Sequence, residues 1–310
     1  MTVAAQQPDA TAAAPGTLML RVAIAAVGVA SLLVVTKFVA YLMTDSIAMM
    51  ASLADSALDV FASTVNLLAI RASLRPADRE HRFGHGKAEP LAGLGQGAFI
   101  AGSGGFLIVE SVSRLIAPHP IEFATVGLVV MGISIATTFA LVIAQRAVVR
   151  RTGSIVVGAD SMHYLSDLLT NAGVVIGIVL ASQFGILVAD PIIGILVAGI
   201  LGHSAYSVFM QSYHQLMDRE LHDADRDRIK TIVRGHPEVR DIHDLRTRAA
   251  GTHQFIQFHI ELDPLITLAR AHEISDAVEH EVMAAFPNAE VIIHQDPAGV
   301  EEARAQFVAH

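Results

Sequence analysis

Six long apolar runs are the feature that most constrains how this chain folds. They are Leu18–Tyr41, Ile47–Ile70, Leu91–Leu115, Phe123–Val149, Ile155–Phe184 and Leu187–Ser212. Each run reaches the ~20 residues that an α-helix needs to cross a hydrocarbon core about 30 Å thick. Charged residues make up only 16% of the 310-residue chain, against about 25% in soluble proteins. The sequence therefore predicts a membrane α-helical fold with six transmembrane helices.

Charge and histidine are concentrated after the last apolar run. The residues that follow Ser212 hold 18 acidic and 10 basic side chains and ten of the 15 histidines. We expect a disordered tail over 1–16, a transmembrane domain over 17–212, an acidic soluble domain over 213–297 and a C-terminal tail over 298–310. The first 16 residues lack the basic region of a signal peptide. The net charge of −9 argues against a nucleic-acid partner.

Basic residues gather in two of the five loops that join the apolar runs. Residues 71–87 hold five Lys and Arg and residues 146–151 hold three, whereas the other three loops hold none. Because Lys and Arg are enriched on the cytoplasmic side of membrane proteins, we expect both termini and the soluble domain in the cytoplasm.

Two pairs of ionisable residues lie inside the apolar runs. Asp55 and Asp59 are in the second run, and His163 and Asp167 are in the fifth. Each pair has i, i+4 spacing, so its members share one helix face. Asp55 and His163 each lie ~12 Å from the start of their runs. Charged groups at this depth are costly and mark functional sites, so we expect one tetrahedral divalent-cation site. A buried polar network with protonated carboxyls is the alternative.

These ligand types narrow the choice of metal. Imidazole with carboxylates suits Zn²⁺ and leaves Fe²⁺, Co²⁺, Ni²⁺, Mn²⁺ and Cd²⁺ open, whereas Mg²⁺ and Ca²⁺ prefer oxygen alone. The chain has no cysteine, which disfavours Cu(I). Ligands must lose their protons before they bind a metal, so metal and protons compete for such a site. Asp160, one turn before His163, is a candidate for the entry path.

A loop after the second run and the soluble domain carry further candidate ligands. Asp78, His81 and His85 are closely spaced in the loop, where a weak metal site and a solvated basic loop are equally consistent with the residues. In the soluble domain the pattern predicts helix 223–235, strands 239–248 and 254–263, helix 267–286 and strand 289–294. The candidate ligands there are His243, His259, His272, His294 and Asp296. Surface histidines of an acidic domain are the alternative.

From about Leu18 to Pro297 the chain resembles the cation diffusion facilitator family, in particular its bacterial zinc and ferrous-iron efflux members. The resemblance rests on the paired ligands in the second and fifth runs, on the loop motif Asp-x-x-His-x-x-x-His and on the terminal His-Gln-Asp-Pro. It implies a homodimeric antiporter of the bacterial inner membrane that exports divalent metal in exchange for protons by alternating access. It implies a transporter rather than an enzyme.

The resemblance also implies roles for the remaining candidates. Asp78, His81 and His85 resemble a second, loop-borne metal site. The five candidates of the soluble domain resemble a binuclear site in which Asp296 bridges two metals. The domain resembles a small αββαβ metallochaperone-like α+β fold that serves metal binding and dimerisation. Zn²⁺ or another divalent transition metal would then be both the substrate and a structural or regulatory ion.

Several alternatives stay open at the level of sequence. The resemblance implies that Lys87 and Asp218 form a charge interlock between the two domains, and interfacial charges with water partners are the competing explanation. A metal channel or an uptake carrier with a cytoplasmic metal-sensing domain has the same ligands, because the residues do not set the direction of transport. A membrane metalloenzyme and an ATP-driven pump are disfavoured, because the chain has no His-Glu-x-x-His, Gly-x-Ser-x-Gly or Walker A motif.

Overall fold

The computed structural model describes residues 15–44, 47–116, 125–184 and 188–300. Most of the two predicted tails, residues 1–14 and 301–310, lies outside the described residues. The chain divides into two compact units, Met1–Leu216 and Met217–His310, and each is described by itself.

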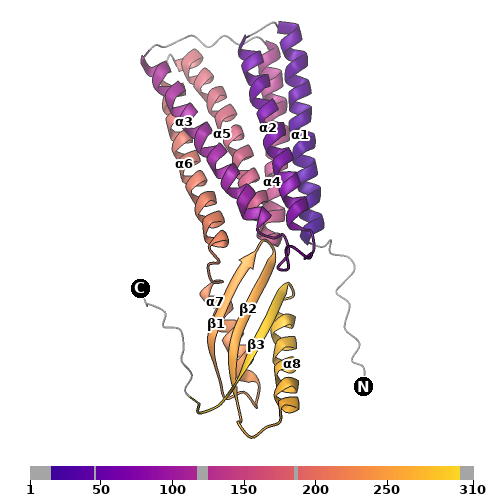
Figure 1. Cartoon of the computed structure of the whole chain (residues 1–310). Helices are drawn as coiled ribbons and strands as arrows, with labels where there is room; N and C mark the ends of the chain where they lie inside the picture. The colour runs from indigo at the N-terminus through magenta and orange to yellow at the C-terminus, as the bar shows by residue number, and fades with distance from the viewer. Residues whose placement is uncertain (1–14, 45–46, 117–124, 185–187, 301–310) are drawn as a thin grey trace. The chain divides into compact units, whose positions relative to one another are not determined.

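Over the described residues, the first unit is built from six long helices (Figure 1). They are α1 Pro15–Thr44, α2 Ile47–Ser73, α3 Ala88–Ile116, α4 Thr125–Thr152, α5 Ile155–Phe184 and α6 Ala189–Leu216. Each predicted apolar run corresponds to one helix, and most helices extend a few residues beyond the run. The start predicted for the fourth run, at residue 123, lies outside the described residues.

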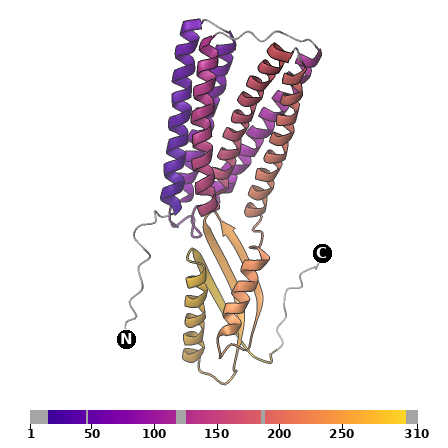
Figure 2. The ribbon, with the colours of Figure 1, turned by 180° about the vertical axis from the view of Figure 1, so that it is seen from behind.

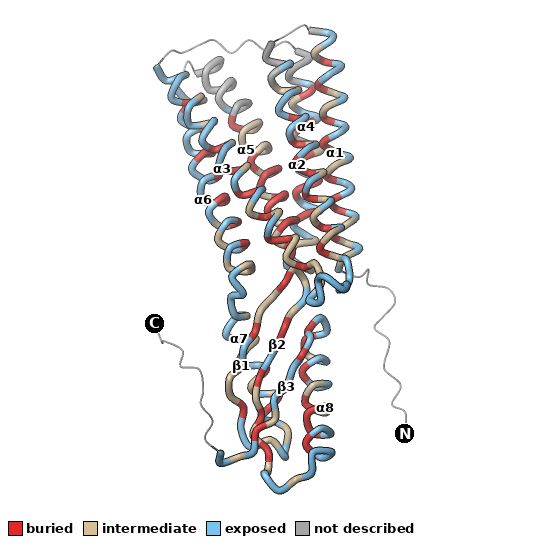
Figure 3. Tube along the Cα trace, viewed as in Figure 1, coloured by how far each residue is buried: buried red, intermediate tan, exposed pale blue. Residues whose placement is uncertain are grey.

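Five of these helices are long and apolar enough to cross a membrane, judged over the described residues. The five segments are Pro15–Met43, Ser52–Ser73, Ala88–Ile116, Val129–Thr152 and Pro191–Leu216. The helix α5 has 30 residues but is not among the five, and it carries Asp160, His163 and Asp167. Exposed residues run along the helices (Figure 3), and Phe61 and Phe106 are 68% and 72% exposed. Surfaces of this kind are stable in contact with lipid rather than water.

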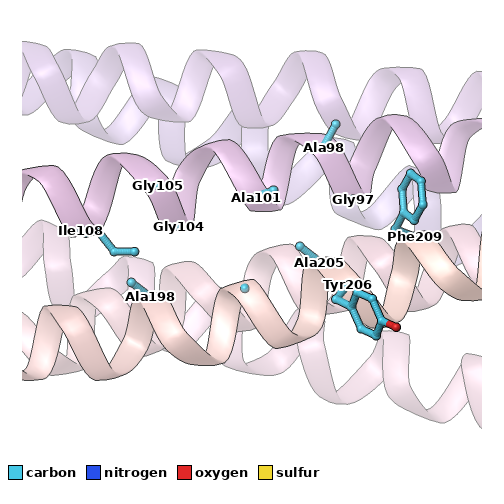
Figure 4. A pocket seen from close by; sticks show the side chains of 11 residues that line it. Gly97, Ala98, Ala101, Gly104, Gly105, Ile108, Ala198, Ala205, Tyr206 and Phe209 are labelled. Carbon is cyan, nitrogen blue, oxygen red and sulfur yellow. The ribbon is translucent and has the colours of Figure 1, made fainter.

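Small residues let α3 and α6 approach each other closely. A Cβ added to Gly104 of α3 would lie 3.2 Å from Cβ of Leu201 of α6. Beside this contact is a groove of about 430 Å³, lined by small residues of both helices together with Ile108, Tyr206 and Phe209 (Figure 4). Because its lining holds no carboxylate and no imidazole, this groove offers no metal ligands.

The second unit has the predicted order helix, strand, strand, helix, strand. Its elements are α7 Asp223–Gly235, β1 Asp241–Ala250, β2 His253–Leu262, α8 Leu268–Ala285 and β3 Ala289–Pro297. In the sheet order β1-β2-β3, β2 pairs antiparallel with β1 and parallel with β3. Both helices cover the same face of the sheet (Figure 2). This is an α+β fold.

The core of the second unit lies between that face of the sheet and the two helices. It contains Ile229 and Val233 of α7, Phe258 of β2, and Ile274 and Val278 of α8, all at most 2% exposed. Alternation along β2 places Phe258 in this core and its neighbour His259 on the opposite face. The face without helices is therefore free to carry polar side chains.

Replacing Phe258 by alanine tests how far this core stabilises the second unit. Phe258 is 1% exposed, and truncating a buried phenylalanine lowers the free energy of unfolding by about 3–5 kcal/mol. Hydrogen exchange of the β1 and β2 amides in the full-length protein measures the change. Gln257→Ala is the control, because Gln257 is exposed on the same strand, and it should leave the exchange unchanged.

Candidate metal centres

A buried group of possible ligands joins α2 and α5. His163 Nε2 lies 3.0 Å from Asp59 Oδ1 and 3.8 Å from Asp167 Oδ2. The three ligand atoms of this group all lie within 4.8 Å of one another. His163 and Asp59 are 3% and 6% exposed. One imidazole and two carboxylates are ligand types that could hold a divalent cation such as Zn²⁺.

The fourth residue of the predicted site, Asp55, is not part of this group. It lies one turn before Asp59 on α2 and is exposed. The structure thus brings together three of the four residues that the sequence singled out, and Asp55 stays a prediction as a ligand.

A buried lysine of α1 lies next to α2. Lys37 of α1 is 9% exposed, and its Nζ donates hydrogen bonds to Ser56 Oγ at 2.6 Å and to the Ser52 carbonyl at 3.2 Å. Ser52 and Ser56 flank Asp55 in the sequence, so the Lys37 amine lies beside the turn that carries Asp55. Lys37 stands near the outer end of an apolar run, where the sequence predicts a side chain that reaches the lipid headgroups, but the structure buries it.

Asp160 is held by two amide side chains that the sequence analysis did not single out. Asn66 Nδ2 of α2 donates to Asp160 Oδ1 at 2.8 Å, and Gln145 Nε2 of α4 donates to Oδ2 at 2.6 Å. All three side chains are buried. This network ties α2, α4 and α5 together one turn before His163. Asn66 lies seven residues after Asp59 and thus on the same helix face, which was the available sequence signal.

The loop between α2 and α3 brings Asp78, His81 and His85 together. Asp78 Oδ1 lies 3.4 Å from His81 Nδ1, and Asp78 Oδ2 lies 3.4 Å from His85 Nε2. The Asp78 and His81 side chains are more than half exposed, so water has access to this group. Backbone hydrogen bonds from His81 and Glu80 lower the pKa of the Asp78 carboxyl below its ordinary value. Asp78 therefore stays ionised and available to a cation at neutral pH.

The variant Asp78→Asn separates the loop's conformation from its affinity for metal. An asparagine oxygen can still accept the hydrogen bonds that the Glu80 and His81 amides donate to Asp78, but it carries no charge. We expect the loop to keep its fold and its zinc affinity to fall at least about tenfold. Isothermal titration with zinc measures the affinity, and amide exchange at His81 reports the fold. An unchanged affinity would contradict a metal site here.

In the second unit, strand pairing lines up three histidines on the face of the sheet that the helices leave uncovered. His243 of β1 is the register partner of His259 of β2, which is also the register partner of His294 of β3. Asp296 Oδ2 lies 3.0 Å from His243 Nε2 and 2.8 Å from His259 Nδ1. Asp296 Oδ1 lies 3.1 Å from His294 Nε2. One carboxylate thus faces three imidazoles from three strands.

The charge of Asp296 suits a metal ligand. Burial acts to raise the pKa of this carboxyl, but the hydrogen-bonding contact with His259 and the charges of His259 and His294 lower it below its ordinary value. Glu261, which sequence reasoning missed, lies 3.4 Å from His243 Nδ1. A carboxylate on the far nitrogen orients a metal-binding histidine.

Two further predictions concern residues outside these groups. His272 lies on α8 with its Nδ1 3.5 Å from Asp276 Oδ1 and its side chain 71% exposed, and it is not part of the sheet cluster. Lys87 Nζ donates to the Leu216 carbonyl at 3.5 Å, and Asp218 Oδ1 lies 3.4 Å from Arg248 Nη1. The contact of Lys87 lies within the first unit, and the contact of Asp218 lies within the second.

Comparison with known proteins agrees with both units. Residues 23–217 match the model of the cation efflux transmembrane domain, and residues 221–298 match that of the cytoplasmic domain of cation efflux proteins. The cation-efflux pump FieF of Shewanella oneidensis is 48% identical over 89% of this chain and 93% of its own length. FieF of Klebsiella pneumoniae is 44% identical over 94% of this chain and 97% of its own length.

A solved structure, the metal-bound C-terminal domain of the CzcD transporter from Thermotoga maritima, is 31% identical over 26% of this chain and 93% of its own, with a TM-score of 0.25. The fit of both family models and the length of the FieF matches decide the assignment. This chain belongs to the cation diffusion facilitator family of cation efflux transporters.

Proposed function

We propose that this protein exports a divalent transition metal from the cytoplasm in exchange for protons by alternating access. We propose Zn²⁺ as its main substrate. The observation that carries the proposal is that carboxylate oxygens of Asp59 and Asp167 lie 3.0 Å and 3.8 Å from His163 Nε2. A bound metal dication offsets the charge of the two carboxylates away from water, and bound protons offset it when the metal is absent. Metal binding therefore releases protons, and proton binding releases the metal.

The proposal includes Asp55 as the fourth transport ligand and α5 as the sixth transmembrane helix. At 30 residues and ~1.5 Å per residue, α5 exceeds the thickness of a hydrocarbon core. Its Asp160 is paired with amides and its His163 with Asp59, which lowers the free energy needed to bury them. The proposal has both termini in the cytoplasm of the bacterial cell and the helices in its inner membrane, and the concentration of Lys and Arg in residues 71–87 and 146–151 supports this orientation.

The second unit is proposed to bind metal ions in the cytoplasm at His243, His259, His294 and Asp296, and to join two copies into a homodimer. His272 belongs to this proposal as a fifth ligand, and the loop residues Asp78, His81 and His85 form a weaker, separate site. The lack of cysteine limits all these sites to imidazole and carboxylate, which release borderline metals more readily than thiolates do.

A flux assay in vesicles with several metals at two pH values tests the choice of substrate. Affinity in the Irving–Williams order favours Zn²⁺ over Fe²⁺ and Mn²⁺ at an imidazole and carboxylate site. We expect Zn²⁺ to be carried at the lowest concentration and to be slowed by acid on the side where it binds. Faster transport of Mg²⁺ or Ca²⁺ than of Zn²⁺ would contradict the proposed ligands.

A further inference from the structure

The strand β1 contains one residue in a left-handed backbone conformation beside the sheet cluster. Asp244 has φ 47°, in the region that few residues other than glycine, asparagine and aspartate adopt. It directly follows His243, whose Nε2 lies 3.0 Å from Asp296 Oδ2. Such backbone conformations gather at functional sites, so its place in the strand is informative.

The register of the sheet shows what this conformation does. His243 pairs with His259, and Arg246 pairs with Gln257. Two residues of β1, Asp244 and Leu245, therefore stand opposite the single residue Phe258. This is a β-bulge, in which the extra residue bends the strand and changes the alternation of its side chains.

The bulge resolves a conflict in the alternation of β1. Ile242 and Thr247 are buried, and Leu245 packs against the core of the second unit. In a regular strand, Ile242 and Leu245 would point to opposite faces, because an odd number of positions separates them. The extra residue lets both contact the core while His243 stays on the same face as its partner His259.

We propose that Asp244 is a positioning residue for metal binding by the second unit, acting through its backbone conformation and not through its carboxylate. This inference rests on the proposed metal site at His243, His259 and Asp296. If the bulge is lost, regular alternation sends either Ile242 or Leu245 out of the core, because the two then point to opposite faces. Thr247 is buried and shares the face of Leu245, so keeping these two in place turns Ile242 outward. Its neighbour His243 then turns toward the core and leaves the cluster.

The test compares residues that accept a left-handed conformation with one that does not. Zinc binding is titrated calorimetrically in the full-length protein in detergent, in a background that carries Asp167→Ala and Asp78→Asn. We expect Asp244→Gly and Asp244→Asn to bind zinc within about twofold of the background protein. Asp244→Val should bind about tenfold more weakly, the loss seen when the support of a metal ligand is disturbed.

Matched variants keep the test decisive. Gln257→Val places the same β-branched residue on a regular, exposed position of β2 and should leave the affinity unchanged. If Asp244→Val does not fold, Asp244→Ala replaces it and should bind several-fold more weakly than Asp244→Gly, which differs from it by one methyl group.

Two results would overturn the inference while leaving the metal site intact. One is equal zinc affinity of the Val and Gly variants. The other is an equal loss in the Asn, Gly and Val variants, which would make the carboxylate the active group. If Asp296→Ala leaves zinc binding in this background unchanged, the proposed site of the second unit is wrong, and the role of Asp244 is wrong with it.

Discussion

Replacing Asp167 by alanine is expected to abolish metal transport and to leave zinc binding by the second unit unchanged. Asp167 Oδ2 lies 3.8 Å from His163 Nε2, close enough for one cation to contact both. Removing even an outer-shell partner of a metal ligand lowers affinity about 10–100-fold, so loss of a ligand should lower the transport rate by more. Metal uptake into vesicles that contain the purified protein measures the rate.

The matched control for Asp167→Ala is its neighbour Ser166. The Ser166 hydroxyl donates to the Met162 carbonyl one turn earlier on the same helix, and it belongs to none of the three ligand groups. Ser166→Ala should transport at nearly the rate of the parent protein. Transport that persists in Asp167→Ala would refute the assignment of the membrane site.

Replacing Asp296 by alanine is expected to remove the stabilisation that zinc gives to the second unit. The Asp296 carboxylate contacts His243, His259 and His294, and the substitution removes the anionic ligand that these three imidazoles share. At a zinc concentration 100 times Kd, binding raises the free energy of unfolding by about 2.7 kcal/mol. Thermal unfolding of the full-length protein with and without zinc should show this increase for the parent alone.

The control for Asp296→Ala is Glu290→Ala, which removes an exposed carboxylate from the same strand. That variant should respond to zinc as the parent does. If zinc stabilises Asp296→Ala as strongly as the parent, the sheet cluster is not a metal site. If zinc changes neither the thermal stability nor the dimerisation of the parent, the proposed metal binding by the second unit is contradicted.

The stability contributed by Asp296 should also depend on pH. Because the pKa of its carboxyl is lowered in the folded protein, the folded state favours the ionised form. This contribution is fully present above the ordinary aspartate pKa of about 3.9 and is lost as the pH falls through the lowered pKa of the folded state. Acidification below about pH 4 should therefore destabilise the parent more than Asp296→Ala.

The regular parts of this fold could be predicted because local patterns determine them. The apolar runs predict the long helices, and the order of elements in the second unit follows from alternation and from turn residues such as Gly251. The bulge at Asp244 could not be predicted from the sequence. Local pattern does not show whether the side chains of β1 alternate regularly or whether one extra residue interrupts the alternation. The sequence carries both Ile242 and Leu245, but only packing decides that both are core residues.

The candidate sites were predictable where their spacing is local and less so where they depend on tertiary contacts. The i, i+4 pair His163 and Asp167 lies on one helix face, and the structure places it as the spacing predicts. The exposure of Asp55 and the burial of Lys37 depend on how α1 and α2 pack, which spacing within one helix does not reveal. The contact of His243 with Asp296 likewise depends on the register of three strands.

The measurement that tests the central claim most directly is zinc flux through the purified protein in vesicles under an imposed pH gradient. If protons and metal compete at Asp59, His163 and Asp167, zinc should move against its own gradient when protons flow in the opposite direction. Dissipating the pH gradient should stop this movement, and Asp167→Ala should lack it. Zinc flux that is insensitive to the pH gradient would identify a channel and contradict the exchange mechanism.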